Sequence, residues 1–454
     1  MSRALAAVSA AWLVFAASAC TGSEPGERWN VVVIVTDDQR ADSIGHSPPA
    51  MPYLESSLAD PGEPWVVFEN AFASSPVCCP SRATMFTGRL PHVHGVLTNA
   101  DGPRLDETST FAAWLREAGY FTGLAGKYLN GYPFRERELV PAGWDRWWGK
   151  RQGLQTSTYV DYELIEQGRP VTYGHDEPDY LTDVLADLAA GFIDEAPGDR
   201  PFLLWVAPTA PHPPWTPANR HDGAFEDLPL DAGPAVGEED VEDKPAWIRA
   251  LPAIGEEQRA ALLDDQRRSL ESLLAVDDLV RRVVETLRER GDLEQTMVVV
   301  VSDNGFSFGE HRWVRKSCPY DECVRVPFVV RYPGAGRRVE NALVSTADLA
   351  PTIAELAEVE IPPDLDGRSL APLLEGRDGA WDGAVVLESF DDRTIPVWRQ
   401  IRTPAFAYVE YETGERELYD LTADPHQLTN VIADPTYSAE RERLSERLAD
   451  LTGG

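Results

Sequence analysis

Basic residues are scarce in this chain of 454 residues, which has 41 lysines and arginines against 75 aspartates and glutamates. The formal net charge of −34 would repel nucleic acids and other polyanions at long range, so nucleic-acid binding is excluded as a function class. An anionic substrate would have to be attracted by a local cluster of cations or by a bound metal ion. The sequence also contains no internal repeat and no low-complexity tract.

Long apolar runs are scarce too, and the clearest one lies near the start of the chain. Arg3 precedes the run Ala4 to Ala19, which is shorter than the roughly 20 residues of a membrane-spanning helix and fits a signal peptide. The run is followed by Cys20, and the small residues before this cysteine resemble a lipoprotein processing site. Such sites usually have leucine three residues before the cysteine, where this chain has Ala17. We expect residues 1–20 to direct export to the cell surface or periplasm, or secretion. A lipid on Cys20 would be the only membrane contact. The alternative is simple cleavage of the signal peptide without lipidation. Residues 21–29 would form a linker.

Cysteines are few, and an exported protein meets oxidising conditions in which they can pair. Apart from Cys20 and Cys78, the chain has Cys79, Cys318 and Cys323, an odd number that cannot all pair internally. Cys318 and Cys323 could close a small loop, but Cys79 could equally take either of them as its partner.

Three β-branched or apolar runs, at residues 31–35, 202–207 and 297–301, have the composition of strands buried on both faces, and each ends in polar or turn-forming residues. Residues 256–290 show apolar positions at helical spacing. Alternating strands and helices predict an α/β layered domain with a mostly parallel sheet. Ligands of such sheets gather beyond the carboxyl ends of the strands.

The chain is expected to divide near residue 365. We predict a catalytic domain over residues 30–365, in which the Pro- and acid-rich residues 211–248 form a long surface loop that could shape the substrate site. Residues 366–454 should form a small C-terminal α+β subdomain with an antiparallel sheet and a final helix near residues 438–451. The strand-like pieces of this subdomain are Ala384 to Phe390, Val397 to Arg402, Ala405 to Tyr411 and Arg416 to Leu421.

Residues 78–89 read CCPSRATMFTGR and resemble the type I sulfatase signature C-x-P-S-R-x-x-x-x-T-G-R at every fixed position. The resemblance implies an alkaline phosphatase-like fold. It also implies that a formylglycine-generating enzyme oxidises Cys78 to formylglycine, whose hydrate supplies the nucleophilic oxygen, and that Arg82 holds this group. A Cys-Cys-Pro turn in an exported protein can otherwise be a disulfide corner or a plain loop.

Asp37 and Asp38 end one predicted strand, and Asp303 and Asn304 end another. Such hard oxygen ligands suit calcium or magnesium. An Asp-Asp pair by itself is more often a helix cap or a solvated turn. The sulfatase resemblance assigns these four residues, together with the converted Cys78, to a metal shell that usually holds Ca²⁺, with Mg²⁺ as the less favoured ion.

A sulfate ester needs cations for its non-bridging oxygens and a proton donor for its leaving oxygen. Lys127, His212 and Lys316 fit these roles, and their flanking segments resemble those of the family. An isolated lysine is more often a solvated surface residue. The catalytic roles of Lys127, His212 and Lys316 are therefore inferred from their position relative to the other motifs. Many sulfatases carry a histidine two residues after the active-site lysine, whereas this chain has Leu129, which can act neither as acid nor as base.

The segments around Cys79, Lys127 and His212 look like those of N-acetylglucosamine-6-sulfatases and related glycosaminoglycan sulfatases, which share the leucine. The resemblance also makes His311 and Asn130 weaker candidates for substrate binding. We therefore expect a sulfatase that acts on sulfated sugars or glycosaminoglycan-like glycans. The alternatives are a phosphodiesterase or phosphonate monoester hydrolase of the same superfamily, and a catalytically silent glycan-binding lipoprotein in which Cys78 is not converted.

Overall fold

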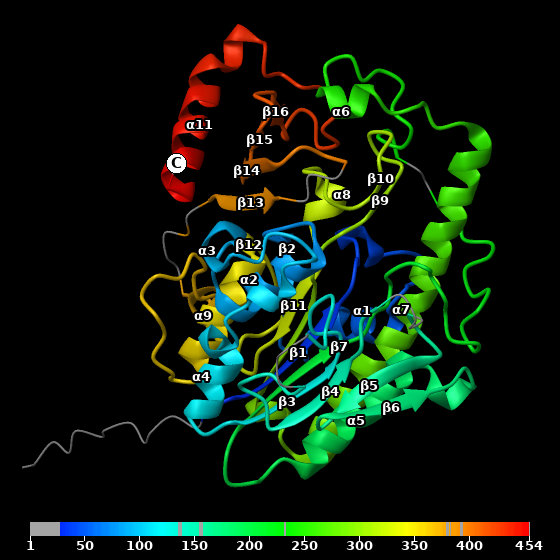
Figure 1. Ribbon diagram of the computed structural model, residues 1–454, viewed down its shortest axis with the longest axis vertical. Helices are drawn as coiled ribbons and strands as arrows, with labels where there is room; N and C mark the ends of the chain where they lie inside the picture. Colours follow the sequence, from blue (N-terminus) through cyan, green and yellow to red (C-terminus); the bar gives the residue numbers. More distant parts are fainter. Residues whose placement is uncertain are drawn as a thin grey trace, which may run out of the picture.

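The structure is a computed structural model, which describes residues 28–453 apart from residues 135–138, 154–157, 231–232, 378–380, 382 and 391–393. The expected signal peptide, Cys20 and most of the expected linker lie outside the described residues. A large layered domain occupies the lower part of Figure 1, and a smaller C-terminal unit lies above it. In the described residues, no helix is both long and apolar enough to cross a membrane.

The central sheet has ten strands in the order β12-β2-β11-β8-β1-β7-β3-β4-β5-β6. Its middle strands β8, β1, β7, β3 and β4 are parallel, while β11, β5 and β6 pair in the antiparallel sense. The strands are β1 (Asn30–Thr36), β2 (Trp65–Phe72), β3 (Phe121–Gly126), β4 (Arg146–Lys150), β5 (Tyr162–Glu166), β6 (Arg169–Tyr173), β7 (Phe202–Ala207), β8 (Thr296–Ser302), β11 (Phe328–Arg331) and β12 (Arg338–Ser345). The predicted mostly parallel α/β sheet is confirmed.

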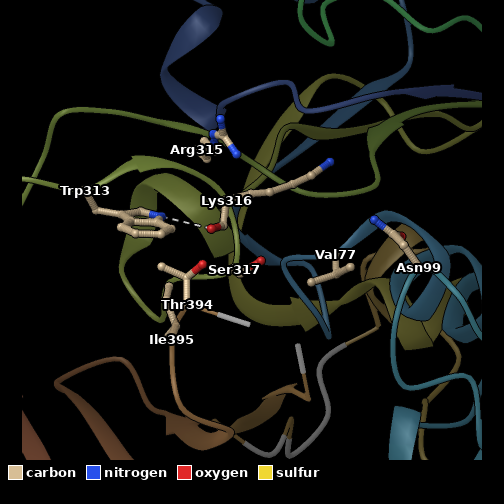
Figure 2. Close-up of a pocket in the computed structure, with 8 residues that line it drawn as sticks. All are labelled: Val77, Asn99, Trp313, Arg315, Lys316, Ser317, Thr394 and Ile395. Atoms are coloured by element: carbon tan, nitrogen blue, oxygen red, sulfur yellow. Dashed lines mark hydrogen bonds between the residues drawn. The ribbon is translucent and has the colours of Figure 1, made fainter. Parts of the chain in front are cut away.

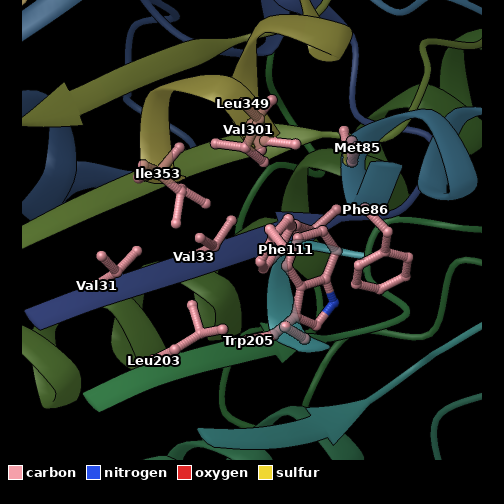
Figure 3. Close-up of a cluster of buried hydrophobic side chains, with 14 of the residues drawn as sticks. Val31, Val33, Met85, Phe86, Phe111, Leu203, Trp205, Val301, Leu349 and Ile353 are labelled. Carbon is pink, nitrogen blue, oxygen red and sulfur yellow. The ribbon is translucent and has the colours of Figure 1, made fainter. Parts of the chain in front are cut away.

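Helices cover both faces of this sheet, so alternate residues of each central strand lie in two different hydrophobic cores. Val31, Val33 and Val35 pack with α2, α4 and α9, whereas Val32 and Ile34 pack with α1, α5 and α7. Figure 3 shows the first of these cores, in which Trp205 of β7 lies against Phe86 and Phe111. Burial on both faces explains why the strands read as continuous apolar runs.

The predicted long helix at residues 256–290 is confirmed as α7, which ends at Gly291 in the left-handed conformation. Its apolar stripe is buried and its opposite face is charged, as expected for a helix on the surface of a sheet. The helices are α1 (Pro52–Ala59), α2 (Cys78–Thr87), α3 (Pro91–His94), α4 (Phe111–Glu117), α5 (Leu181–Glu195), α6 (Ala246–Arg249), α7 (Glu256–Arg290), α8 (Asp321–Val324), α9 (Leu349–Leu356), α10 (Ala371–Leu374) and α11 (Ser438–Thr452).

The C-terminal unit contains an antiparallel sheet in the order β13-β14-β15-β16, with α11 packed against it, as predicted (Figure 1). Its strands are β13 (Val385–Ser389), β14 (Trp398–Arg402), β15 (Phe406–Tyr411) and β16 (Arg416–Asp420). This sheet touches the segment that follows a short hairpin of β9 (Ser307–Phe308) and β10 (Val314–Arg315). The indole of Trp398 donates to the carbonyl of Ser317, and the amide of Gln400 donates to that of Pro319. The C-terminal unit therefore supports a loop of the large domain.

Candidate active site

The carboxyl ends of four adjacent strands bring the predicted polar residues together. Thr36 of β1 pairs with Ser302 of β8, so the residues that follow each strand are neighbours. The backbone N–H of Asp38 donates to Oδ1 of Asp303 over 3.2 Å, and Nδ2 of Asn304 donates to Oδ1 of Asp38 over 2.6 Å. Asp38 has a φ of +64°, a left-handed conformation that aspartate tolerates better than most residues.

Cys78 is the first residue of α2, and its side chain is fully buried beside this edge of the sheet. Its Sγ lies 3.4 Å from Oδ1 of Asp37 and 2.7 Å from Nζ of Lys316. Burial and the negative charge of Asp37 raise the pKa of the Cys78 thiol to about 12, against the opposing effect of Lys127 and Lys316. The unmodified sulfur is therefore held as a thiol.

The second half of the sulfatase-like motif holds the end of α2. Gly88 ends the helix with a φ of +68°, and a Cβ there would lie 3.2 Å from side-chain atoms of Leu365 and Pro351, so any other residue would be strained and crowded. Arg89 donates to Ser109 and to the carboxylate of Asp364. These contacts fix the position of the helix that carries Cys78.

Arg82 ties the motif to the strand ends. Its Nε donates to Oδ2 of Asp303 over 2.7 Å, and its NH1 donates to the carbonyl of Lys127 over 2.8 Å. A third nitrogen, NH2, lies 3.9 Å from Oδ2 of Asp37. Burial opposes the charge of Arg82, but Asp303 and Asp37 outweigh it and raise the pKa of the guanidinium. A buried arginine with these partners stays charged and orients two carboxylates.

Two lysines complete the buried cluster. Lys127 follows β3 and places Nζ 2.5 Å from Oδ2 of Asp37, while Lys316 places Nζ 2.6 Å from Oδ1 of Asp38. Burial lowers the pKa of each ammonium, but Asp37 beside Lys127 and Asp38 beside Lys316 outweigh it, and both values are raised. Both lysines are therefore charged, and can neutralise an anion bound at Cys78.

His212 lies at the mouth of the cluster, in the loop after β7. Its Nδ1 donates to the carbonyl of Pro213, which leaves Nε2 free to face Oδ2 of Asp38 at 3.8 Å. The hydroxyl of Tyr159 donates to the carbonyl of His212 and holds its backbone. The side chains of His212 and Lys316 are 33% and 16% exposed, whereas that of Asp38 is only 1% exposed. A substrate would therefore reach Cys78 past the imidazole and this ammonium.

The residues predicted to bind a metal ion have side chains and positions that suit one. Ligand atoms of Asp37, Asp38 and Cys78 lie within 4.8 Å of one another. Oδ2 of Asp38 and Oδ1 of Asn304 are buried, and among the described residues neither has a hydrogen-bond partner. A buried polar atom without a partner is costly, and a hard cation would satisfy both oxygens. Asp303 stands beside them and already bonds Arg82 and the Asp38 N–H.

A cavity of about 310 Å³ opens beside Lys316. Figure 2 shows it between the loop that precedes α2, the loop that carries Lys316 and the C-terminal unit. It is lined by Val77, Asn99, Trp313, Arg315, Lys316, Ser317, Thr394 and Ile395. This volume lies at the lower end of the range for small-molecule sites.

The two weaker candidates for substrate binding lie elsewhere. The imidazole of His311 is fully buried, its Nδ1 lies 2.8 Å from Glu238, and its ring packs on Tyr320. The backbone N–H of Asn130 donates to Sγ of Cys79. Neither His311 nor Asn130 lines the cavity beside Lys316, and their substrate roles remain predictions.

The cysteine alternatives are resolved by the structure. Cys318 and Cys323 form a disulfide, which is one of the alternatives that the sequence left open. Cys79 is a free, buried thiol that accepts the N–H of Asn130, and burial raises its pKa to about 11.

Three residues of the site were not among the predicted ones. Ser81 donates to the carbonyl of Asp303, Asn99 accepts the N–H of Cys79, and Arg315 lines the cavity. Ser81 could have been found, because it is a fixed position of the motif. Asn99 and Arg315 carry no local signal, since their place depends on loops that meet only in the folded chain.

The fold and the site define a class of protein in which a buried cysteine at the start of a helix faces carboxylates and cations at the edge of an alkaline phosphatase-like sheet. The sulfatase family model matches residues 29–359, and the model described as N-sulphoglucosamine sulphohydrolase, C-terminal, matches residues 309–453. The chain therefore belongs to the sulfatase family of sulfuric ester hydrolases.

Among curated proteins, the chain is 32% identical to human N-acetylglucosamine-6-sulfatase, with 94% of this chain and 86% of that protein aligned. Among solved structures, it is similar to a protein in complex with its substrate D-glucosamine-2-N,6-O-disulfate, with a TM-score of 0.82, 25% identity, and 94% and 98% of the two chains covered. The phosphonate monoester hydrolase of Agrobacterium radiobacter has a TM-score of 0.75 at 23% identity, covering 94% and 96%, and so shares the fold.

Proposed function

We propose that this protein hydrolyses sulfate esters of glucosamine-type sugars, as found in glycosaminoglycan-like glycans. The observation that carries the proposal is the position of Cys78, whose Sγ lies 2.7 Å from Nζ of Lys316 and 3.4 Å from Oδ1 of Asp37. The names of the human relative and of the substrate in the similar solved structure support the sugar class.

We further propose that Cys78 is converted to formylglycine. The hydrated aldehyde would supply a nucleophilic oxygen in place of the sulfur. Arg82 is placed to hold the carboxylates around this position, because it contacts Asp303 and the carbonyl of Lys127. Lys127 and Lys316 are charged. Lys316 contacts Cys78 and Lys127 contacts Asp37, which itself contacts Cys78, so both lysines can hold non-bridging oxygens of the ester.

His212 is the candidate for protonation of the leaving oxygen. Its Nδ1 proton is engaged with the carbonyl of Pro213, so the proton that can be given away is the one on Nε2. Nε2 faces the cluster, and the side chain is 33% exposed, so that it can regain a proton from solvent. This geometry matches a general acid at the mouth of the site.

Asp37, Asp38, Asp303, Asn304 and the oxygen at position 78 would hold Ca²⁺, with Mg²⁺ as the alternative. The ion would stabilise negative charge on the nucleophile and on the bound ester. This proposal is supported by the oxygen-rich donor set and by two buried oxygens, Oδ2 of Asp38 and Oδ1 of Asn304, that form no hydrogen bond with the described residues.

Two features of the whole chain also remain proposals. The signal peptide and the lipid on Cys20 rest on residues outside the described part of the chain, and so does export. The division into a catalytic domain of residues 30–365 and a subdomain of residues 366–454 is supported by the separate antiparallel sheet, which begins at Val385.

Paired assays test the proposed function. Protein produced together with a formylglycine-generating enzyme should turn over N-acetylglucosamine-6-sulfate much faster than the matching phosphate monoester, phosphodiester and phosphonate monoester. A reversed preference would favour the phosphodiesterase or phosphonate alternative. Binding of the sulfated sugar without turnover, by protein whose Cys78 remains a thiol, would favour the silent glycan-binding alternative.

A further inference from the structure

Arg315 lines the cavity beside Lys316, and its guanidinium has no partner among the described residues. Arg315 is exposed and lines this cavity together with Lys316 and Asn99. Within the described ranges, no hydrogen bond or ion pair involves its guanidinium, although acidic residues outnumber basic ones by 75 to 41. Its neighbour Lys316, in contrast, is bonded to Asp38 and Cys78. Arg315 is therefore a positive charge available to a ligand beside the reacting group.

The backbone around Arg315 is held in an unusual conformation. Arg315 has a φ of +109° and Ser317 a φ of +77°, values that residues other than glycine rarely adopt. Such strain persists only where surrounding contacts enforce it, and it often marks a functional site. Here the indole of Trp313 donates to the carbonyl of Lys316, and the N–H of Ser317 donates to the carbonyl of Pro76. The loop is thus fixed in a shape that presents two adjacent cations.

The two cations have different surroundings. The ammonium of Lys316 contacts Cys78, whereas Arg315 lines the cavity and its side chain extends from the same loop as Lys316 (Figure 2). The rest of the wall combines apolar surface from Val77 and Ile395 with polar groups such as Asn99. Apolar surface with a few polar groups suits one saccharide unit, whose hydroxyls and anionic substituents need partners.

We propose that Arg315 is a specificity-determining residue, which binds a second anionic substituent on the sugar whose sulfate ester is cleaved at Cys78. This inference rests on the proposed sulfatase function and narrows its substrate class to sugars that carry two anionic groups. The overall charge of −34 disfavours polyanions at long range, so preference for such a sugar must arise from a local contact of this kind. A guanidinium can bind a sulfate through two parallel N–H donors, which a lysine cannot do.

The test compares two substrates, D-glucosamine-2-N,6-O-disulfate and N-acetylglucosamine-6-sulfate, on wild-type protein and on Arg315→Gln. Wild type should prefer the disulfated sugar in kcat/KM. Because the contact is exposed, Arg315→Gln should reduce this preference about 3- to 10-fold, mainly through KM. Arg315→Lys should lie between the two, and added salt should reduce the wild-type preference. The matched control is Arg169→Gln, an exposed arginine at the far edge of the sheet, which should keep the wild-type preference.

A binding measurement separates this inference from the proposed function. Calorimetry with D-glucosamine-2-N,6-O-disulfate on Cys78→Ala, which cannot turn it over, should give a Kd about 3- to 10-fold lower than on Cys78→Ala/Arg315→Gln. Equal Kd values, or the same substrate preference in wild type and Arg315→Gln, would overturn the role of Arg315 and leave the sulfatase function standing. Absence of sulfate-ester turnover by converted wild-type protein would overturn the proposed function, while the calorimetric comparison still decides whether Arg315 binds the second anion.

Discussion

Nε of Arg82 lies 2.7 Å from Oδ2 of Asp303, and neither side chain is exposed. The pair joins the helix that begins at Cys78 to the end of strand β8, two parts of the chain separated by 221 positions. Removing one partner of a buried ion pair leaves the other charge unpaired, at a cost of about 3–5 kcal/mol. Substitution of Arg82 would therefore combine loss of stability with loss of function. Variants at other residues of the site separate the two effects better.

Conversion of Cys78 should be visible in the mass of the peptide that contains it. Replacement of the thiol by an aldehyde lowers the mass by about 18 Da. Cys78→Ala should abolish turnover. Cys79→Ser is the matched control and should retain most of the activity, because Cys79 is a neighbouring buried thiol that contacts the backbone of Asn130. An unmodified Cys78 peptide in fully active protein would contradict this prediction, as would equal losses in the two variants.

Asp38→Asn should remove the metal ion and most of the activity. The substitution keeps the shape of the side chain but replaces one hard anionic ligand, so we expect a rate reduced by roughly 10³-fold or more. Elemental analysis should show less than one calcium or magnesium per chain, and exhaustive chelation should inactivate wild type until the ion is restored. Asp42→Asn is the control, because Asp42 lies nearby but is 57% exposed and pairs with Arg40. Wild-type activity after complete removal of metal would refute the metal site.

His212→Ala should affect poor leaving groups most. A sugar alcohol needs a proton as it departs, whereas an activated phenol does not, so we expect a loss of about 10²- to 10⁴-fold on a sugar sulfate and clearly less on 4-nitrophenyl sulfate. His175→Ala, at a side chain that is 77% exposed, should leave both rates unchanged. Similar losses on the two substrates would instead make His212 a sulfate-binding residue, with Lys316 the next candidate for the acid.

Stability should depend on pH through Asp348, a buried carboxylate immediately before α9. Its carboxylate accepts the N–H groups of Ser345 and Arg368, but burial outweighs these bonds and raises the pKa of Asp348 from 3.8 to about 6. Between these values the folded state holds a proton that the unfolded state has released. The contribution of Asp348 to the free energy of unfolding is therefore complete below pH 3.8 and falls as the pH rises to about 6.

Urea denaturation of wild type and Asp348→Asn at several pH values measures this effect. Because the asparagine does not titrate, wild type should lose stability relative to the variant between about pH 4 and pH 7, by up to about 3 kcal/mol. Any constant difference reflects the altered hydrogen bonds to Ser345 and Arg368, so the slope is the relevant quantity. Parallel pH profiles for the two proteins would show that Asp348 titrates normally.

Much of the fold followed from local patterns. The strand at residues 31–35 is a continuous apolar run because it is buried on both faces. The helix at residues 256–290 has apolar residues at helical spacing because it is buried on one face. The short strands after residue 384 are separated by turn-forming residues, and the observed strands differ from the predicted pieces by only one residue or so at their ends. Such features depend on neighbours along the chain, which the sequence displays directly.

The sequence by itself determined the residues that could carry the chemistry, because the motif at residues 78–89 and the Asp-Asp and Asp-Asn pairs after two strands are each contiguous in the chain. Only the tertiary structure decided which distant groups meet. It paired Cys318 with Cys323, bonded His311 to Glu238, and left the Arg315 guanidinium without a partner among the described residues, beside a cavity that loops from both units line. The partner and the burial of a polar side chain depend on which segments meet in the folded chain, and no local pattern records that choice.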